Sequence, residues 1–402
     1  MPPHLAGRTD EQEKFKALLR QSIITDNLIM TGLRGIGKTV LLESLKPIAR
    51  QAGWLWAGDD LTESKSLSEG RIADSLVTDL SLTLGPLFMQ SQIEMPIGFT
   101  TKTESARRPL EYSDLRKIYE NTPGLPADKV KAVLRFVGSL LSQTNFNGII
   151  FAYDEAQNLG DRAQDKEYPL SLLLDVFQSL QRSPGGLPFM LVLTGLPTLF
   201  AKLNNARTYT ERMFDVFLVN KLTPTESRDA ILKPIQDAKC PIRFSEPTVD
   251  RVVEMSGGYP YFIQFICKEI YDVWIVKTGQ GEQPSVPETE IIRKLDLRFF
   301  SARWDTASDR QRDFMKVVAL LPSARNEFRV QDIVESSKEV LEKPFSLANA
   351  GMMLKTLIEN GFIFRNRRGK YSFAVPLLDR FILRQMGNNA NLPAPFGDAS
   401  GD

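Results

Sequence analysis

In the first half of the chain, short apolar runs alternate with longer segments in which apolar residues recur at helical spacing. A short uninterrupted apolar run is typical of a strand buried on both faces, whereas the periodic segments predict amphipathic helices. Strands that alternate with helices predict a mainly parallel sheet with helices on both faces. We therefore expect an α/β fold, with strands at residues 27–31, 54–57, 148–153, 188–195 and 214–219.

The second half of the chain shows mainly helical periodicity. Residues 278–285 are polar and contain Gly, Pro and Ser, as linkers do. After them, helices ending with one at 347–359 precede two short apolar stretches, which is the order of a winged helix. The predicted domains are an α/β domain at 1–221 with a partly ordered insertion at about 91–126, a helical domain at 222–280, a winged-helix domain at 288–386 and a disordered tail at 387–402.

Composition excludes several classes of function. Lys and Arg number 50 and Asp and Glu 49, so any surface for nucleic acid must be a local patch. The one histidine, His4, rules out histidine-based triads and metal sites, and Cys240 and Cys267 have no metal-binding spacing. No apolar run approaches the ~20 residues of a membrane helix, and the N-terminus has no signal-peptide pattern. We therefore expect a cytoplasmic protein.

A phosphate-binding motif follows the first predicted strand. Residues Gly32-Leu33-Arg34-Gly35-Ile36-Gly37-Lys38-Thr39 form a complete G-x-x-x-x-G-K-[ST] sequence, and a helix begins near Val40. A strand, a loop and a helix in this order direct backbone N–H groups and the positive helix end at one point, which suits a polyphosphate. Lys38 would reach the outer phosphates and Thr39 would bind Mg²⁺. The alternative is a chance match in a glycine-rich turn.

Two acidic residues end the apolar run at 148–153. Hydrolysis of a bound nucleotide needs a second metal anchor and a means to activate water. We assign Asp154 to the metal and Glu155 to the proton of the attacking water. Gln157 follows on the same turn and can contact the γ-phosphate. Acidic pairs at strand ends also cap helices, and this alternative stays open.

The next strand and the segment after it supply two further candidates. Thr194 ends the strand at 188–195, where its hydroxyl can hold the attacking water, although it can instead cap the helix that begins near Pro197. Arg212 precedes the last strand, and a guanidinium there can stabilise the phosphoryl group on a neighbouring subunit. Arg207 is a rival for this role, and both are also compatible with ordinary surface arginines.

Together these motifs resemble the AAA+ ATPases, in particular the Orc/Cdc6-like branch with a C-terminal winged helix. Gly7-Arg8-x-x-Glu11 is similar to the N-terminal motif whose arginine lies over the adenine. The loop at 32–39 resembles Walker A, and residues 149–155 resemble Walker B. Asp154-Glu155-Ala156-Gln157 has the form seen in relatives that serve secretion and transposition, while Thr194 and Arg212 fall at sensor 1 and the arginine finger. The resemblance implies ATP and Mg²⁺ as cofactors, a helical lid at 222–280 and a nucleotide-dependent homo-oligomer.

One motif departs from the Orc/Cdc6 pattern. The lid of that family carries a sensor-2 arginine after a glycine-rich turn, but here the turn reads Gly257-Gly258-Tyr259-Pro260 and no arginine follows it. The same turn resembles the lids of STAND-type signalling ATPases, which use the nucleotide state to switch or assemble. The resemblance thus leaves open how the lid senses nucleotide.

Basic residues gather at the predicted wing. Arg365, Arg367, Arg368 and Lys370 can meet DNA phosphates, and Lys355 and Asn349 lie on the predicted recognition helix. A solvated basic turn on a domain used for protein contacts is the alternative. The leading hypothesis is therefore a Mg-ATP-dependent AAA+ ATPase that binds double-stranded DNA. The alternative is a STAND-like switch for signalling or defence whose winged helix docks a protein partner.

Overall fold

The protein is described here by a computed structural model, which covers residues 5–21, 24, 26–85, 87–97, 100–183, 186–240, 243–279 and 286–387. The chain divides into two compact units. The first unit contains residues 1–32 and 37–219, and the second contains residues 33–36 and 220–402. The predicted tail at 388–402 and most of the predicted linker at 278–285 lie outside the described residues.

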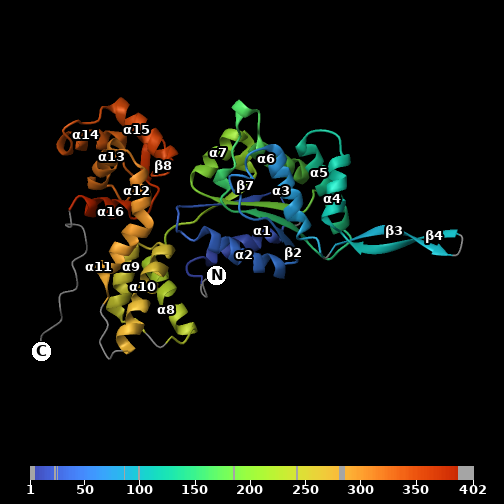
Figure 1. The fold of residues 1–402 in the computed structure, drawn as a ribbon, viewed down its shortest axis with the longest axis horizontal. Helices are drawn as coiled ribbons and strands as arrows, with labels where there is room; N and C mark the ends of the chain where they lie inside the picture. The colour runs from blue at the N-terminus through green and yellow to red at the C-terminus, as the bar shows by residue number, and fades with distance from the viewer. Residues whose placement is uncertain are drawn as a thin grey trace. The chain divides into compact units, whose positions relative to one another are not determined.

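A parallel sheet forms the centre of the first unit, as the alternation of strands and helices predicted. Its strand order is β2-β5-β6-β1-β7, and every neighbouring pair is parallel (Figure 1). Strands β1, β5 and β6 are buried along their whole length, because helices cover both faces of the sheet. The bounds are β1 Asn27–Thr31, β2 Trp54–Ala57, β5 Gly148–Tyr153, β6 Phe189–Gly195 and β7 Phe214–Leu218.

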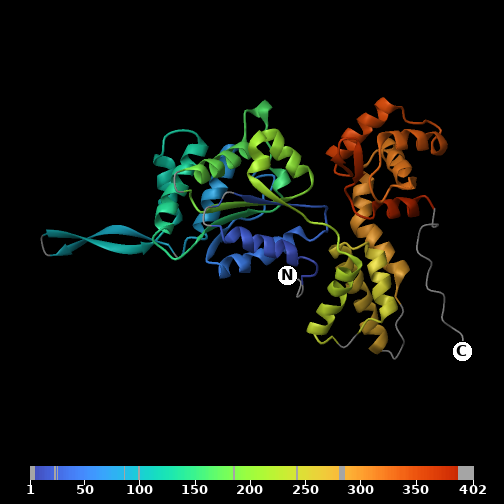
Figure 2. The same ribbon diagram turned by 180° about the vertical axis from the view of Figure 1, so that it is seen from behind.

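Helices cover the two faces of this sheet unequally. The helices α1 and α2 lie on one face, and α3, α5, α6 and α7 lie on the other, where they share a large apolar core with the strands (Figures 1 and 2). The helix bounds are α1 Thr9–Leu19, α2 Lys38–Gln51, α3 Glu69–Ser81, α5 Pro126–Leu141, α6 Pro169–Arg182 and α7 Thr198–Ala206. Short 3-10 turns η1 Ala156–Asn158, η2 Ala163–Asp165 and η3 Thr208–Arg212 connect them.

The stretch predicted as a partly ordered insertion contains a hairpin and a helix. Strand β3 Phe88–Ile97 pairs antiparallel with β4 Thr100–Pro109, and α4 Tyr112–Asn121 follows. The hairpin extends away from the sheet of its unit (Figure 1). Its residues are largely polar and threonine-rich, so the alternation that marks a half-buried strand was too weak to predict it. Helix α4 is fixed by Asp114, which accepts from the Glu111 N–H at 3.0 Å and pairs with Arg108.

The second unit is almost entirely helical. Three helices come first, α8 Pro224–Asp237, α9 Glu246–Ser256 and α10 Pro260–Gly279. They are followed by α11 Glu288–Leu295, the π-helical turn η4 Asp296–Ser301, α12 Ala302–Thr306, α13 Asp309–Leu320, α14 Val330–Val340, α15 Leu347–Glu359, β8 Ile363–Arg367, β9 Lys370–Phe373 and α16 Leu378–Gln385. Strands β8 and β9 form an antiparallel hairpin directly after α15.

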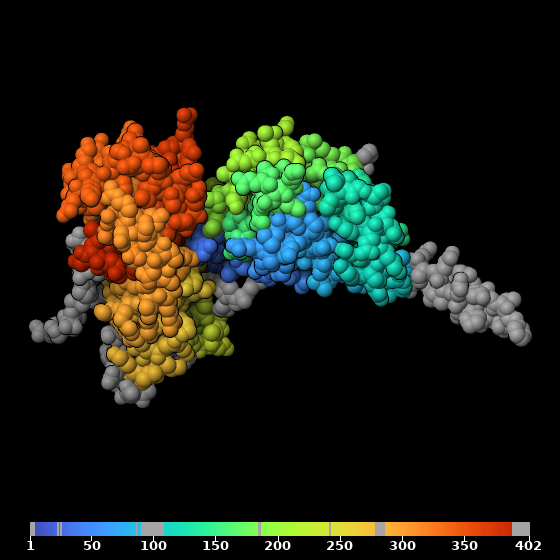
Figure 3. Space-filling view, turned by 45° about the horizontal axis from the view of Figure 1, so that its top comes forward, coloured from blue at the N-terminus to red at the C-terminus, as the bar shows by residue number. Residues whose placement is uncertain are grey.

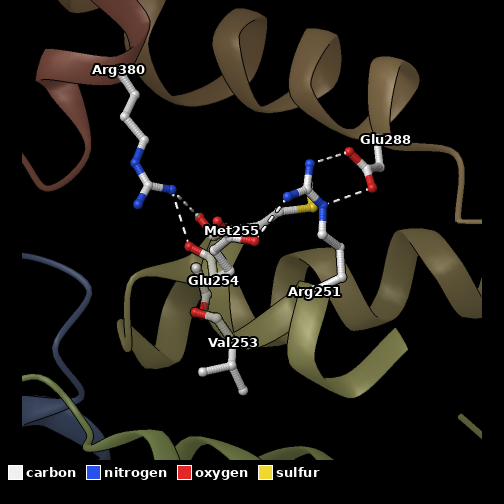
Figure 4. A network of polar contacts seen from close by, with 7 residues as sticks. Arg251, Val253, Glu254, Met255, Glu288 and Arg380 are labelled. Atoms are coloured by element: carbon white, nitrogen blue, oxygen red, sulfur yellow. Dashed lines mark hydrogen bonds and ion pairs between the residues drawn. The ribbon is translucent and has the colours of Figure 1, made fainter. Parts of the chain in front are cut away.

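Arginines tie the C-terminal helices of this unit to α9. The buried Arg251 binds both carboxylate oxygens of Glu288, at 2.7 and 2.5 Å, and also pairs with Glu254 (Figure 4). Arg380 of α16 donates to the carbonyls of Glu254 and Met255, at 3.1 and 3.2 Å. These carbonyls belong to the last turn of α9 and lack intrahelical donors. The Arg380 guanidinium supplies the missing hydrogen bonds, and its positive charge interacts favourably with the negative end of the helix dipole.

Candidate nucleotide-binding site

The phosphate-binding motif forms a tight loop between β1 and the N-terminus of α2. Gly35 and Gly37 adopt positive φ angles of 72° and 92°, which residues with a side chain rarely do, and Gly37 caps the helix. The loop closes on itself, because the Lys38 ammonium donates to the Gly32 carbonyl at 3.0 Å. Leu33, Arg34, Ile36 and Val40 complete the predicted binding segment. The arrangement points the helix N-terminus into the loop, as a phosphate site requires.

The two residues predicted to bind Mg²⁺ meet at the end of β5. The Thr39 hydroxyl lies 2.5 Å from Oδ2 of Asp154, whose other oxygen accepts from the Glu155 N–H at 2.8 Å. Asp154 is buried and Thr39 is exposed. A hydroxyl and a carboxylate are both suitable oxygen ligands for Mg²⁺, and they come from segments 115 residues apart. The residues present therefore fit the metal.

Glu155, the predicted base, is held by Gln157. The residue has a positive φ of 52°, which is uncommon for a side chain other than glycine or asparagine. Its carboxylate accepts from the Gln157 side-chain amide, and the amide oxygen of Gln157 accepts from the Leu196 N–H at 3.0 Å. Both ends of the Gln157 amide are thus occupied. Contact with a γ-phosphate, as predicted, requires one of these bonds to break.

Two polar groups near Gln157 and Asp154 were not predicted. Lys202 donates to the Gln157 carbonyl at 2.6 Å, and burial lowers the pKa of its ammonium. Asp60 lies beside Asp154, because the loop after β2 follows the end of β5. Burial and the neighbouring charges of Asp154, Asp59 and Glu155 raise the pKa of the Asp60 carboxyl. Asp60 could have been predicted from the sequence, because it follows strand β2, which lies next to β5 in the sheet.

Thr194 places a buried hydroxyl at the carboxyl end of β6. Its side chain is fully buried, and its oxygen has no hydrogen-bond partner among the described residues. The alternative that Thr194 caps the following helix is not seen, because α7 has no side-chain cap. Thr31, at the end of β1, has a second buried hydroxyl without a partner among the same residues. An unpaired buried hydroxyl is costly, so each of these two oxygens is able to hydrogen-bond a water or a ligand.

The remaining arginines predicted for the nucleotide lie in different environments. Arg8 is buried at the start of α1 and pairs with Glu11 at 3.6 Å. Arg212 is exposed in η3, and its side chain makes no hydrogen bond or ion pair with any described residue. Its rival Arg207 is also exposed and donates to the neighbouring Ala206 carbonyl at 3.1 Å. Exposure suits both a surface role and donation to another subunit.

The wing residues form an exposed basic turn. Arg365, Arg367 and Arg368 are exposed and Lys370 is half-buried on the hairpin β8–β9, which lies within the orange-to-red surface of Figure 3. Arg367 pairs with Glu327 at 2.9 Å, and the hydrogen bonds from Asn366 and then from Arg367 lower the pKa of the Glu327 carboxyl. The wing therefore carries fewer free charges than its sequence suggests.

The helix before the wing has an exposed face of mixed character. Asn349 and Lys355 are exposed on α15, as base or phosphate contacts would require. The side chains of Leu347 and Met352, on the same helix, are 61% and 65% exposed. Exposed apolar groups of this size favour contact with another apolar surface. No helix among the described residues is long and apolar enough to span a bilayer.

Comparison with solved structures identifies the class of the fold. The ADP form of the ORC2 protein from Aeropyrum pernix matches with 14% identity, 96% of each chain covered and a TM-score of 0.55. The same protein in ADPNP-ADP complexes matches with 13% identity, 96% of each chain and a TM-score of 0.53. The chain thus shares the fold of these ORC2 structures over almost its whole length. The sequence motifs predicted this fold.

Sequence comparison adds little to this result. A family model described as a domain of unknown function, DUF8462, matches residues 297–382. This segment runs from the π-helical turn η4 into α16 and lies wholly in the second unit. No curated protein matches the chain.

Proposed function

We propose that this protein is a Mg²⁺-dependent ATPase that binds ATP on the loop at residues 32–39. The observation that carries the proposal is the 2.5 Å contact between Thr39 and Asp154 beside a glycine loop that ends at a helix N-terminus. Mg²⁺ is commonly held by few protein oxygens together with nucleotide phosphates, and this pair is suited to that role. The structurally similar ORC2 protein was solved in ADPNP-ADP complexes, which supports an adenine nucleotide as the ligand.

Each side chain of the site has a defined task in this proposal. Lys38 exchanges the Gly32 carbonyl for an outer phosphate, and Mg²⁺ bound by Thr39 and Asp154 would supply positive charge to the phosphoryl group. Glu155 accepts the proton of the attacking water after it is released from Gln157. The unpartnered Thr194 hydroxyl holds that water or a phosphate oxygen.

The assembly of subunits would complete the site. Arg212 is exposed and has no acceptor among the described residues, so it is available to a nucleotide on a second copy of the chain. A guanidinium supplied in this way stabilises the charge that develops during phosphoryl transfer. Arg8 would contribute from within the same chain, beside the adenine. These roles imply a homo-oligomer whose assembly depends on nucleotide.

Replacing Lys38 tests the nucleotide site. Lys38→Ala removes the ammonium that would contact the phosphates, and we expect ATP affinity to fall at least about a hundredfold in a calorimetric titration with Mg²⁺. Lys46→Ala, on the same helix, is the matched control and should bind ATP as the parent does. If Lys38→Ala keeps the affinity of the parent protein, the loop is not the nucleotide site.

We further propose that the wing binds double-stranded DNA, mainly through its phosphates. The charges of Arg365, Arg368 and Lys370 support this assignment, and Lys355 lies on the preceding helix. Arg367 can join them only by leaving Glu327, and Asn349 is the side chain suited to a base. Contacts led by phosphates make the affinity strongly dependent on salt.

Two exposed apolar side chains on α15 support a second candidate function, the docking of a protein partner. The exposed Leu347 and Met352 on α15 favour an apolar protein surface over a DNA groove. Together with the turn Gly257-Gly258-Tyr259-Pro260, this supports a nucleotide-controlled switch that docks a protein partner. Duplex binding that does not depend on salt, or no duplex binding, would favour the switch over the DNA-binding ATPase.

A further inference from the structure

A cavity lies in the first unit, at the amino edge of its sheet. Its volume is about 610 Å³, within the range of roughly 300–1,000 Å³ that is usual for small-molecule pockets. It is formed by the ends of α1 and α2, which lie side by side, and by the start of β2 (Figure 1). Helix α2 begins at Lys38 and ends at the cavity, so its 14 residues, roughly 21 Å in length, separate the cavity from the proposed phosphate ligands.

The walls of the cavity are mainly apolar. The indole ring of Trp54, which is the first residue of β2, forms one wall. Its place is fixed by Gly148, because a side chain there would lie 2.2 Å from Cζ3 of the indole. The other apolar walls come from Leu19, Ile24, Ile48 and Pro188. A flat apolar group can therefore pack against a held aromatic ring.

Two buried polar atoms on the cavity lining have no partner in the described part of the chain. Trp54 is only 3% exposed, and its Nε1–H has no acceptor there. Oε1 of Gln21 is also buried and has no donor there. Asn147, a third polar residue of the lining, is by contrast occupied, since its side-chain amide donates to the Ala52 carbonyl at 2.8 Å. The cavity thus presents one donor and one acceptor whose burial is costly while they are unpaired.

The charged side chains that line the cavity are both basic. Lys16 is paired with Glu13 at 2.7 Å, but Arg20 is exposed and makes no hydrogen bond or ion pair with the described residues. No acidic residue is among the described residues of the lining. The end of α1 contributes about half a negative charge, which the full charge of the Arg20 guanidinium exceeds. An anion is therefore favoured at Arg20.

We infer that the cavity binds a small organic anion that has an aromatic body and an N–H or O–H donor. The indole N–H of Trp54 donates to an oxygen of this ligand, Oε1 of Gln21 accepts from its donor, and Arg20 attracts its negative charge. The aromatic body packs on the indole ring. The inference does not depend on the proposed nucleotide site, because none of the residues 32–39 lines the cavity.

A pair of fluorescent probes tests the class of ligand. Anilinonaphthalenesulfonate has an aromatic body, one N–H donor and a sulfonate, whereas N-phenylnaphthylamine has the same rings and donor without the sulfonate. In fluorescence titrations the parent protein should bind the sulfonate probe about tenfold more tightly than the neutral probe. Equal affinities would mean that the cavity selects only an apolar body, which contradicts the inference.

Two tryptophan variants test the donor. Trp54→Phe keeps an aromatic wall but removes the N–H, so it should weaken binding of the sulfonate probe about tenfold. Trp56→Phe is the matched control, because Trp56 packs edge to face against Phe15 and does not line the cavity. It should change the affinity less than twofold. If Trp54→Phe binds the probe as tightly as the parent protein, the indole N–H has no ligand to bind and the inference is wrong.

Two arginine variants test the charge. Arg20→Gln should weaken binding of the sulfonate probe about fivefold and leave binding of the neutral probe unchanged. Arg50→Gln removes an exposed arginine from the last turn of α2, outside the lining, and should affect neither probe. Because Arg20 is exposed and unpaired among the described residues, its variant should melt at the temperature of the parent protein and remains informative even if Trp54→Phe does not fold. Equal weakening of both probes by Arg20→Gln would contradict a role for its charge.

Competition with nucleotide separates the cavity from the phosphate loop. Saturating ATP with Mg²⁺ should leave the sulfonate probe bound, and Lys38→Ala should bind the probe as the parent protein does. If ATP displaces the probe from the parent protein but not from Lys38→Ala, the probe occupies the nucleotide site and the inference is wrong. Failure of ATP to bind at all would overturn the proposed nucleotide site and leave the assignment of the cavity intact.

Discussion

The carboxyl edge of the sheet and the wing both carry polar residues, but they hold them in different ways. At the sheet edge, Asp154 is buried and both of its oxygens are bonded, while Thr194 has a buried hydroxyl without a partner in the described structure. On the wing, Arg365 and Arg368 are exposed. Buried polar groups must be placed accurately to be stable, whereas exposed charges tolerate many arrangements. The positions of the polar groups at the sheet edge therefore indicate a specific reaction, whereas the wing indicates only an affinity for negatively charged ligands.

The largest effect is expected at Glu155. Glu155→Gln keeps the shape of the side chain but removes the proton acceptor, so turnover of ATP should fall about a thousandfold while ATP affinity stays within a few fold. Steady-state hydrolysis and a binding titration measure the two quantities. Glu120→Gln, an exposed glutamate of the same unit that pairs with Arg116, is the control. Full hydrolysis by Glu155→Gln would mean that another group activates the water.

A glycine-to-alanine series compares the backbone in the two regions. Gly58 has a φ of 117°, and a Cβ there would lie 2.0 Å from the Ala152 carbonyl oxygen, so Gly58→Ala should lower the free energy of unfolding by about 3 kcal/mol or more. Gly369 on the wing has a φ of 74° but open space around it, and its alanine variant should cost about 1 kcal/mol. Chemical denaturation measures both.

Gly85 provides the control for this series. It has open space around it and no positive φ, so Gly85→Ala should be close to neutral. If Gly58→Ala were as stable as Gly85→Ala, the loop after β2 would not lie against Ala152 of β5 as described. The position of Asp60 beside Asp154 would then be wrong as well.

Removing charged side chains from the wing is expected to weaken DNA binding by a smaller factor than Glu155→Gln slows hydrolysis. Arg365→Ala combined with Arg368→Ala should weaken duplex binding about tenfold and lower the slope of log affinity against log salt by about 1.8. Arg367→Ala should do less, because Arg367 is partly neutralised by Glu327. Fluorescence anisotropy at several salt concentrations checks both. An unchanged slope in the double variant would remove the DNA assignment and leave the wing as a docking site.

The same contrast explains what the sequence could predict. Strands β1, β5 and β6 are continuous apolar runs, and Asp154 follows one of them directly, so the sheet and the order of its motifs were predictable. Asp60 and Thr31 were missed, because their neighbours come from distant segments that the fold brings together. The β3–β4 hairpin was missed for a different reason, since a mostly polar ribbon has little periodicity to detect.

The smallest expected effect is on the melting temperature, and it comes from the repulsion of Asp60 by Asp154, Asp59 and Glu155. Because burial and nearby carboxylates raise the pKa of Asp60 in the folded protein, its protonated form is favoured by folding. Its contribution to stability is therefore fully present below the pKa of the unfolded state and is lost as the pH rises through the folded value. Asp60→Asn, which cannot ionise, should raise the melting temperature slightly at pH 7 and leave it unchanged near pH 3.

The effect must be small, because Asp60 is exposed and water screens its neighbours. Mg²⁺ sharpens the test: a cation bound by Thr39 and Asp154 would offset the same repulsion, so the gain from Asp60→Asn at pH 7 should shrink when Mg²⁺ and ATP are added. The matched change Asp165→Asn, in the 3-10 turn η2, should show neither dependence. A gain for Asp60→Asn that is equal at both pH values would mean that the carboxylates do not interact, and that the sheet edge is as loosely arranged as the wing.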